Sequence, residues 1–599
     1  MMLKRSTRES KSKPKPGKAT QLARAGVAGL AALAAVTGLA TGCLDRKVVA
    51  TSPTTSNVFV DQIVQTAVDK IDLLFMIDNS VSMADKQEIL AAAVPVLLKR
   101  LVTPICVGAD GTTPTMGNAD PTTGLCAGAN SQPEFAPIGD IHIGIVSSSL
   151  GAHGGSVCAS VDPNDPNASI TFLDDKGELM GKKRPNVVSW NQSGFLAWDP
   201  SGTKDNPPGV NDVMTLNTQF TAMVTATGEH GCGYEASLEA WYRFLVDPEP
   251  PANVTKDTAK NITVRGSQLV VNPDGTTGAC MGCDTDLLAQ RKAFLRPDSL
   301  VAIVMLSDEN DCSIQDEGVG WFVGATSHMP KATAPCAQNP NDPCCRSCAQ
   351  NETSPPPGCM PLSADPVCMG APAGTYNTWD NQNDSLNLRC YNQKQRFGFD
   401  LLYPTARYVN ALTAQNIQLE SDGTKSVVNP LYDTQGSGQP ARDPSLIFLA
   451  GLVGVPWQDI ASSDSLTSPN ALTYLNATDL LANNRWPVLL GDSTASPPVA
   501  PSDPFMVESI PARSGSNPFA MPQQSIVGSD SMNPQANLIN GHEQSIPAND
   551  DLQFACTFKL STAKMCMPGD SACDCSAAKD GTTTVLAASN SPLCQPPGG

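Results

Sequence analysis

The feature that most constrains this chain is an almost unbroken apolar run that ends in oxygen-bearing side chains. Residues 71–77 read Ile-Asp-Leu-Leu-Phe-Met-Ile, and Asp78, Ser80 and Ser82 follow. A run of strand length without polar alternation is typical of a strand buried on both faces, as in a parallel sheet. Ligands of open α/β sheets bind beyond the carboxyl ends of the strands, where these side chains would lie. One carboxylate and two hydroxyls on a short loop suit a hard divalent cation, Mg²⁺ or Ca²⁺.

Similar apolar runs recur along the chain and alternate with amphipathic patterns. Further strands are predicted at 141–147, 300–306 and 446–453. Helices are predicted over 82–101, 220–227, 238–245 and 395–413, with Pro95 expected to kink or restart the first of them. Strands alternating with helices predict an α/β fold with a doubly wound, mostly parallel sheet flanked by helices.

Long polar segments rich in Pro and Gly interrupt this pattern. Insertions are expected near 106–137, 158–217, 249–296 and 312–394, followed by a Pro/Ser-rich extension over 459–555 and a Cys-rich tail over 556–599. Because the tail has little apolar sequence, we expect it to rely on cross-links rather than on a core.

The chain contains 20 cysteines, a number suited to an oxidising compartment. Cys106 and Cys126 are the expected partners across one surface loop, and the rest of the connectivity stays open. The pairs Cys280-x-x-Cys283 and Cys345-x-x-Cys348 resemble zinc knuckles, but their wide separation and an exported context favour disulfides.

The N-terminal residues predict export. Residues 1–24 are basic, residues 25–42 form an uncharged run rich in Ala, Gly and Leu, and Cys43 follows directly. This order resembles the lipobox of bacterial lipoproteins, which implies a signal peptide over 1–42, a diacylated Cys43 and a tether over 43–68. The alternatives are another signal type or a retained membrane anchor, which would be short and weakly apolar.

The net charge of −19 bears on the partners. Because residues 1–42 hold eight Lys or Arg and one Glu, the remainder is still more acidic. Such a chain has no electrostatic basis for binding nucleic acid or an anionic lipid surface.

A family resemblance joins these features. The apolar strand, Asp78-x-Ser80-x-Ser82, the amphipathic helix and a later strand ending at Asp308 resemble the von Willebrand factor type A domain, over roughly 69–458. The resemblance implies a metal-ion-dependent adhesion site. There, the hydroxyls of Ser80 and Ser82 would bind Mg²⁺, Ca²⁺ or Mn²⁺ directly, and Asp78 and Asp308 would act largely through water.

The chain departs from the family pattern at one position. The family supplies a Thr from the loop that opens its third helix, and no Thr stands near Gly231-Cys232-Gly233. Either Thr227 contributes, Glu229 or Glu235 substitutes, or the metal site is weakened or empty. The carboxylates after the strand at 300–306 have a second interpretation, in which Glu309 and Asp311 belong to a solvated acidic turn.

These patterns predict a lipid-anchored protein of the bacterial cell envelope, facing the periplasm or the cell surface. It would bind a protein or extracellular-matrix ligand through an acidic residue of that ligand, with a divalent cation between them. No catalytic residue is predicted. The alternative is a metal-independent structural or assembly component of an envelope complex, and a hydrolase is a distant third.

Overall fold

The structure is a computed structural model that describes most of the chain after Lys70. Described are residues 70–507, except for 81–82, 129, 152–157, 159–173, 185, 229–230, 297–298, 326, 381–382, 385, 434–441, 468–472, 493–494 and 496–498, together with 518–519, 544–545 and 552–553. The predictions for the signal peptide, Cys43, the tether and the Cys-rich tail therefore lie outside the described residues, as does Ser82. Among the described helices, none has the length and apolar character needed to span a bilayer.

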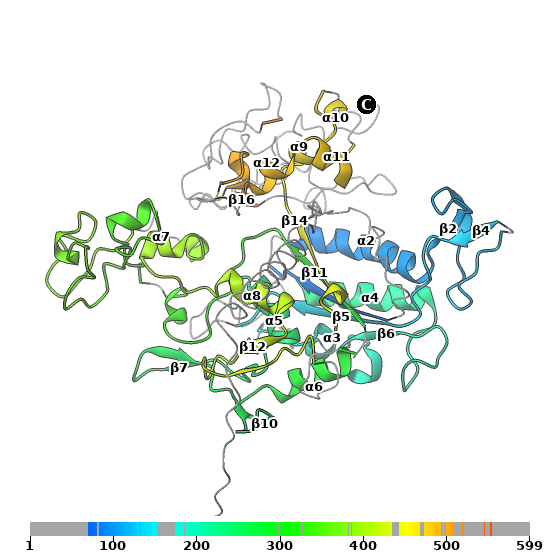
Figure 1. Ribbon diagram of the computed structural model, residues 1–599, viewed down its shortest axis with the longest axis horizontal. Coiled ribbons are helices and arrows are strands. Elements are labelled where there is room, and N and C mark those ends of the chain that lie inside the picture. Colours follow the sequence, from blue (N-terminus) through cyan, green and yellow to red (C-terminus); the bar gives the residue numbers. More distant parts are fainter. Residues whose placement is uncertain are drawn as a thin grey trace, which may run out of the picture. The chain divides into compact units, whose positions relative to one another are not determined.

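A five-stranded sheet organises the described chain (Figure 1). Its strands are β1 (Ile71–Ile77), β5 (Ile141–Ser147), β6 (Leu196–Trp198), β11 (Leu300–Ser307) and β14 (Ile447–Val453), in the order β14-β11-β1-β5-β6. All neighbours pair in parallel except β5 and β6, which are antiparallel. The predicted α/β fold with a mostly parallel sheet is thus confirmed. The strand order reverses at β1, because the chain adds β5 and β6 on one side of it and then β11 and β14 on the other.

Eleven α-helices are described outside the sheet. They are α2 (Ala84–Val102), α3 (Met180–Lys183), α4 (Val213–Thr227), α5 (Ser237–Leu245), α6 (Thr285–Phe294), α7 (Gln393–Phe397), α8 (Thr405–Thr413), α9 (Trp457–Ile460), α10 (Ser463–Thr467), α11 (Ala477–Ala482) and α12 (Trp486–Leu490).

Small antiparallel sheets decorate the segments between the main strands. They consist of β2 (Ile105–Gly108) with β3 (Pro114–Asn118) and β4 (Ser131–Pro133), β7 (Thr255–Asp257) with β8 (Ile262–Val264), β9 (Gln268–Val271) with β10 (Thr277–Met281), β12 (Asn416–Gln418) with β13 (Ser426–Val428), and β15 (Gln544–Ser545) with β16 (Leu552–Gln553).

The inner strands β1, β5 and β11 are buried on both faces of the main sheet, whereas the edge strand β14 is largely exposed. Side chains alternate between the two faces along each strand. On β1, Leu73, Phe75 and Ile77 pack with apolar side chains of α2 and α4. Leu74 and Met76 point the other way and pack with residues of α5, α6 and α8. All seven residues of β1 are buried, including Asp72, as expected for a strand covered by helices on both sides.

Two helix predictions need correction. The helix after β1 continues through Pro95 as one element, with Val94 and Leu98 on its buried face. Of the two predicted effects of Pro95, a kink or a restart, the restart is therefore wrong. The helix predicted over 395–413 is two helices, because Gly398 adopts a left-handed conformation that ends α7, and α8 begins only after Pro404.

Seven disulfides cross-link the described insertions. They join Cys106–Cys126, Cys158–Cys232, Cys280–Cys283, Cys312–Cys390, Cys336–Cys345, Cys344–Cys359 and Cys348–Cys368. The predicted partnership of Cys106 and Cys126 is confirmed. Because all four cysteines of the zinc-knuckle alternative are paired in disulfides, that alternative is wrong.

Candidate functional site

The carboxyl ends of β1, β5 and β11 meet at one edge of the sheet and carry polar loops. The backbone N–H of Asp78 donates to Leu306 O at 2.9 Å, and that of Ser148 donates to Ile77 O at 3.2 Å. These bonds extend the parallel pairing by one residue beyond β1. The loops that follow the three strands are therefore held side by side.

Asp78 is fully buried at the centre of these loops. Its Oδ1 accepts the N–H of Ser80 at 2.9 Å and the hydroxyl of Ser148 at 3.4 Å. Its Oδ2 accepts the hydroxyl of Ser307 at 2.7 Å. Three strands thus fix the orientation of this carboxylate.

The turn before α5 is joined to the same loops. The N–H of Gly231 donates to Asn79 O at 2.8 Å, and Asn79 Oδ1 accepts the hydroxyl of Ser149 at 2.8 Å. Gly231 has no room for a side chain, because a Cβ there would overlap Asn79 Oδ1 and Ser149 Oγ. This close approach brings Glu235, at the end of the turn, beside the carboxylates that follow β1 and β11.

Four carboxyl groups gather at this edge, and we call Asp78, Glu235, Asp308 and Glu309 the acidic cluster. Burial and the charge of Asp308 raise the pKa of Asp78 to about 6. Burial and the charge of Asp78 raise the pKa of Glu235 to about 8, although a hydrogen bond with Glu309 opposes the shift. Burial and then the charge of Glu235 raise the pKa of Glu309 well above its usual range. Carboxyl groups that resist ionisation in this way lack sufficient compensating positive charge.

A lysine supplies some of that charge. Lys86, in the first turn of α2, lies 3.1 Å from Asp308 Oδ2 through its Nζ. Both side chains are almost fully buried, with 4% and 0% exposure. The neighbouring Gln87 donates through Nε2 to Asp78 O at 3.1 Å and to Gly228 O at 2.7 Å. The first turn of α2 therefore packs directly on the acidic cluster and on the end of α4.

The predicted site residues are only partly brought together. Asp78, Ser80 and Asp308 belong to this edge, and Glu235 joins them. Thr227, the last residue of α4, is buried, but its hydroxyl donates to Met223 O at 3.2 Å within its own helix. Ser82 and Glu229 lie outside the described residues.

The solvated acidic turn proposed for the residues after β11 is wrong. The carboxyl of Glu309 is hydrogen-bonded to Glu235. Asp311 Oδ1 accepts the N–H of Leu238 at 2.8 Å and the hydroxyl of Ser313 at 2.8 Å. Asp311 therefore satisfies an N–H at the start of α5, where helices leave such groups without a partner of their own.

The donors at this edge fit a hard divalent cation. The acidic cluster and the hydroxyl of Ser80 offer oxygen atoms, which Mg²⁺, Ca²⁺ and Mn²⁺ prefer. Burial first and the charges of neighbouring carboxylates second raise the pKa of three of the four groups, and a cation bound among them would oppose both effects. Sequence reasoning missed Lys86, Ser148 and Ser307, since isolated Lys and Ser residues carry no signal until a fold brings them to a site.

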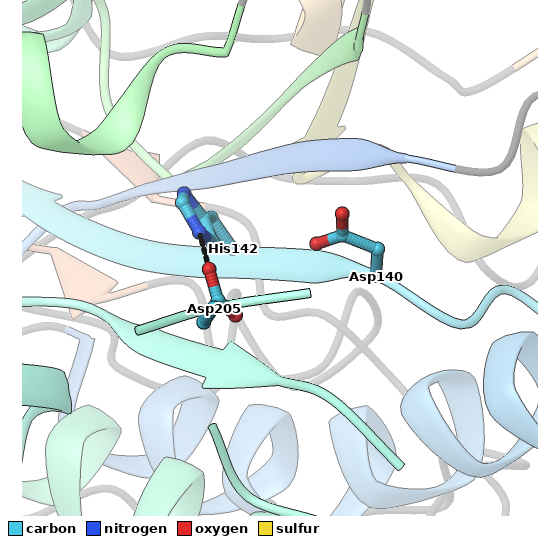
Figure 2. A group of neighbouring side chains, drawn as sticks. All are labelled: Asp140, His142 and Asp205. Atoms are coloured by element: carbon cyan, nitrogen blue, oxygen red, sulfur yellow. Dashed lines mark hydrogen bonds and ion pairs between the residues drawn. The ribbon is translucent and has the colours of Figure 1, made fainter. Parts of the chain in front are cut away.

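The sequence analysis did not predict a second group of possible metal ligands. One ligand atom from each of Asp140, His142 and Asp205 lies within 4.8 Å of the others, in an arrangement that could hold a metal ion (Figure 2). Asp140 and His142 stand at the start of β5, so the group lies at the opposite edge of the sheet from the acidic cluster. The spacing Asp-x-His at a strand start, which puts both side chains on one face, was the available signal.

Comparisons with known proteins add no further information. No family model matches the sequence, and neither a curated protein nor a solved structure matches it.

Proposed function

We propose that this chain is a von Willebrand A-like binding module whose ligand site is the acidic cluster. The observation that carries the proposal is the concentration of buried, mutually repelling carboxyl groups at the carboxyl edge of β1 and β11. The strand order supports it, because doubly wound sheets bind ligands where the order reverses, and β1 is that strand here.

In this proposal a divalent cation is held by Ser80 and by Asp78 and Asp308, with Glu235 in place of the Thr that the family supplies. The bound cation would supply an open coordination position for a carboxylate of a protein ligand. The hydrogen bonds from Ser80, Ser148 and Ser307 hold Asp78 in one orientation before any ligand arrives. Such preorganisation lowers the entropic cost of binding.

A second candidate function rests on Lys86. Its ammonium group, 3.1 Å from Asp308, is an internal cation at the same place. A domain that keeps this ion pair would bind its partner without metal, as a structural or assembly component of an envelope complex. The two candidates differ in whether a divalent cation displaces Lys86 from Asp308.

Calorimetric titration with Mg²⁺, Mn²⁺ and Ca²⁺ tests the proposal. We expect the acidic cluster of wild type to bind one ion and that of Asp78→Asn to bind it at least about tenfold more weakly, a loss of about 1.4 kcal/mol or more. Lys86→Met should bind the ion more tightly than wild type, because the competing ammonium is gone. Glu317→Gln removes an exposed carboxylate and is the matched control. Equal affinities of wild type and Asp78→Asn would contradict the metal site.

Capture of protein ligands from bacterial envelope extract separates the two candidates. Loss of capture in EDTA supports the cation-dependent module, and unchanged capture supports the metal-independent component.

We also propose that Cys43 is acylated and anchors the module at the bacterial envelope. The support is the sequence of residues 1–43, a basic segment followed by an apolar run and a Cys. Labelled palmitate should attach to the wild type and fail to attach to Cys43→Ala. Equal labelling of both would contradict the anchor.

A further inference from the structure

Three side chains meet at the amino-terminal edge of the sheet, away from the acidic cluster. Asp140 precedes β5, His142 is its second residue, and Asp205 belongs to the segment between β6 and α4. Figure 2 shows the imidazole of His142 and the carboxylate of Asp205 facing one another, with Asp140 beside them. All three side chains are at least nine-tenths buried, with exposures of 5%, 3% and 9%.

The hydrogen bonds of His142 determine which of its nitrogens is available. Its Nδ1 lies 2.8 Å from the carbonyl oxygen of Phe294, which can only accept, so Nδ1 carries a proton. In the neutral imidazole, Nε2 then presents a lone pair to Asp205 Oδ1 at 3.3 Å. Two acceptors at this distance repel one another unless a metal ion or a proton on Nε2 lies between them. A His whose other nitrogen donates to a backbone carbonyl is also the usual arrangement of a metal ligand.

Asp205 supplies an independent observation. Its Oδ2 is buried and has no hydrogen-bond partner among the described residues. A buried carboxylate oxygen without a partner is unfavourable, because desolvation is not compensated. The backbone holds this carboxylate in place, since Asp199 accepts the N–H groups of Thr203, Lys204 and Asp205 at 3.1, 2.9 and 3.2 Å.

Contacts with neighbouring residues also hold the side chains of Asp140 and His142 in place. Arg296 pairs with Oδ1 of Asp140 and donates through Nε to Asp72 Oδ1 at 2.8 Å. The His142 ring packs against Phe195, with centroids 4.5 Å apart. Both contacts restrict the rotation of the side chains that converge on the group.

We propose that Asp140, His142 and Asp205 bind a divalent first-row transition ion of the Zn²⁺ class. One imidazole nitrogen with two carboxylates is a donor set that Zn²⁺ accepts and that is less suited to Mg²⁺ or Ca²⁺. Three protein ligands leave a position for water. The ion joins the segment carrying Asp205 to the start of β5, and its role is separate from that of the acidic cluster.

The test uses the full chain, freed of metal with a chelator and then given Zn²⁺. X-ray absorption at one equivalent of Zn²⁺ on wild type should show one imidazole and oxygen ligands. Competition titration should show that Asp205→Asn and His142→Gln each lose at least about 100-fold in Zn²⁺ affinity. Asp286→Asn, at an exposed position, and Asp78→Asn, in the acidic cluster, should leave this affinity unchanged.

Three results would overturn the proposal. The first is sulfur ligation or the absence of imidazole in the absorption spectrum of wild type. The second is equal Zn²⁺ affinity of wild type and Asp205→Asn. The third is a nitrogen NMR signature of His142 with protons on both ring nitrogens in the presence of Zn²⁺, because a protonated histidine paired with Asp205 then explains the geometry. The absorption measurement needs no variant and so stands even if a variant fails to fold.

Discussion

Replacing Glu235 by Gln should stabilise the protein in a pH-dependent way. In the folded protein the pKa of Glu235 is raised from 4.5 to about 8 by burial and by the charge of Asp78. Between these two values the unfolded chain has released a proton that the folded chain keeps. The free energy of unfolding therefore falls as pH rises through this window.

The magnitude follows from the size of the shift. Each pKa unit corresponds to about 1.4 kcal/mol, so the raised pKa of Glu235 lowers the free energy of unfolding by up to about 5 kcal/mol above pH 8. This destabilisation vanishes below about pH 4.5. Because the repulsion is shared among Glu235, Asp78 and Glu309, the shift does not belong to Glu235 alone. We therefore expect the free energy of unfolding of Glu235→Gln to exceed that of wild type by about 2 to 5 kcal/mol near pH 8. Glu309 donates to the carboxylate of Glu235, and the amide oxygen of Gln can still accept that hydrogen bond.

The assay is chemical denaturation followed by Trp fluorescence, from about pH 5 to about pH 9, in the presence of EDTA. Glu317→Gln, the same chemical change at an exposed position, is the control and should follow wild type throughout. Saturating Mg²⁺ should reduce the gain, because a bound cation compensates the same charge. A gain that does not depend on pH, or a loss of stability near pH 8, would refute the reasoning.

Two further predictions concern packing. Gly231→Ala should destabilise the protein by about 1 to 3 kcal/mol, because its Cβ would overlap Asn79 Oδ1, whereas Gly423→Ala, which meets nothing within 4 Å, should change stability little. Thermal unfolding of the two variants compares them directly, and equal midpoints would contradict the close approach. Leu74→Ala, at a position with no exposure in the core, should cost about 2 to 5 kcal/mol, and Val96→Ala, which is 69% exposed, should cost little in urea unfolding. A similar cost for both would place Leu74 outside the core.

The four parallel strands could be predicted from the sequence because each is a continuous apolar run. The sequence of each strand is sufficient to predict it, as for Ile71–Ile77 and Leu300–Ser307. A strand that is buried on both faces is apolar at nearly every position and does not alternate with polar residues. β6 could not be recognised, because its three residues lie inside a polar segment. The insertion predicted over 158–217 also covers the first five residues of α4 and the segment that carries Asp205.

The candidate site could be predicted as far as its strand-end residues. Asp78 and Asp308 were found because they follow apolar runs, and parallel strands bring such ends together. Lys86 was not found, since a lysine in the first turn of a helix ordinarily faces solvent. His142 and Asp205 were not found, because 63 residues separate them and only the pairing of β5 with β6 brings their segments together.

The most direct test of the central claim is a crystal structure of the full chain soaked in Mn²⁺, with anomalous diffraction. The account predicts an anomalous peak within about 2.4 Å of Ser80 Oγ. It also predicts that Lys86 Nζ moves away from Asp308 Oδ2. No peak at the acidic cluster, with Lys86 still paired to Asp308 at high Mn²⁺ concentration, would contradict it.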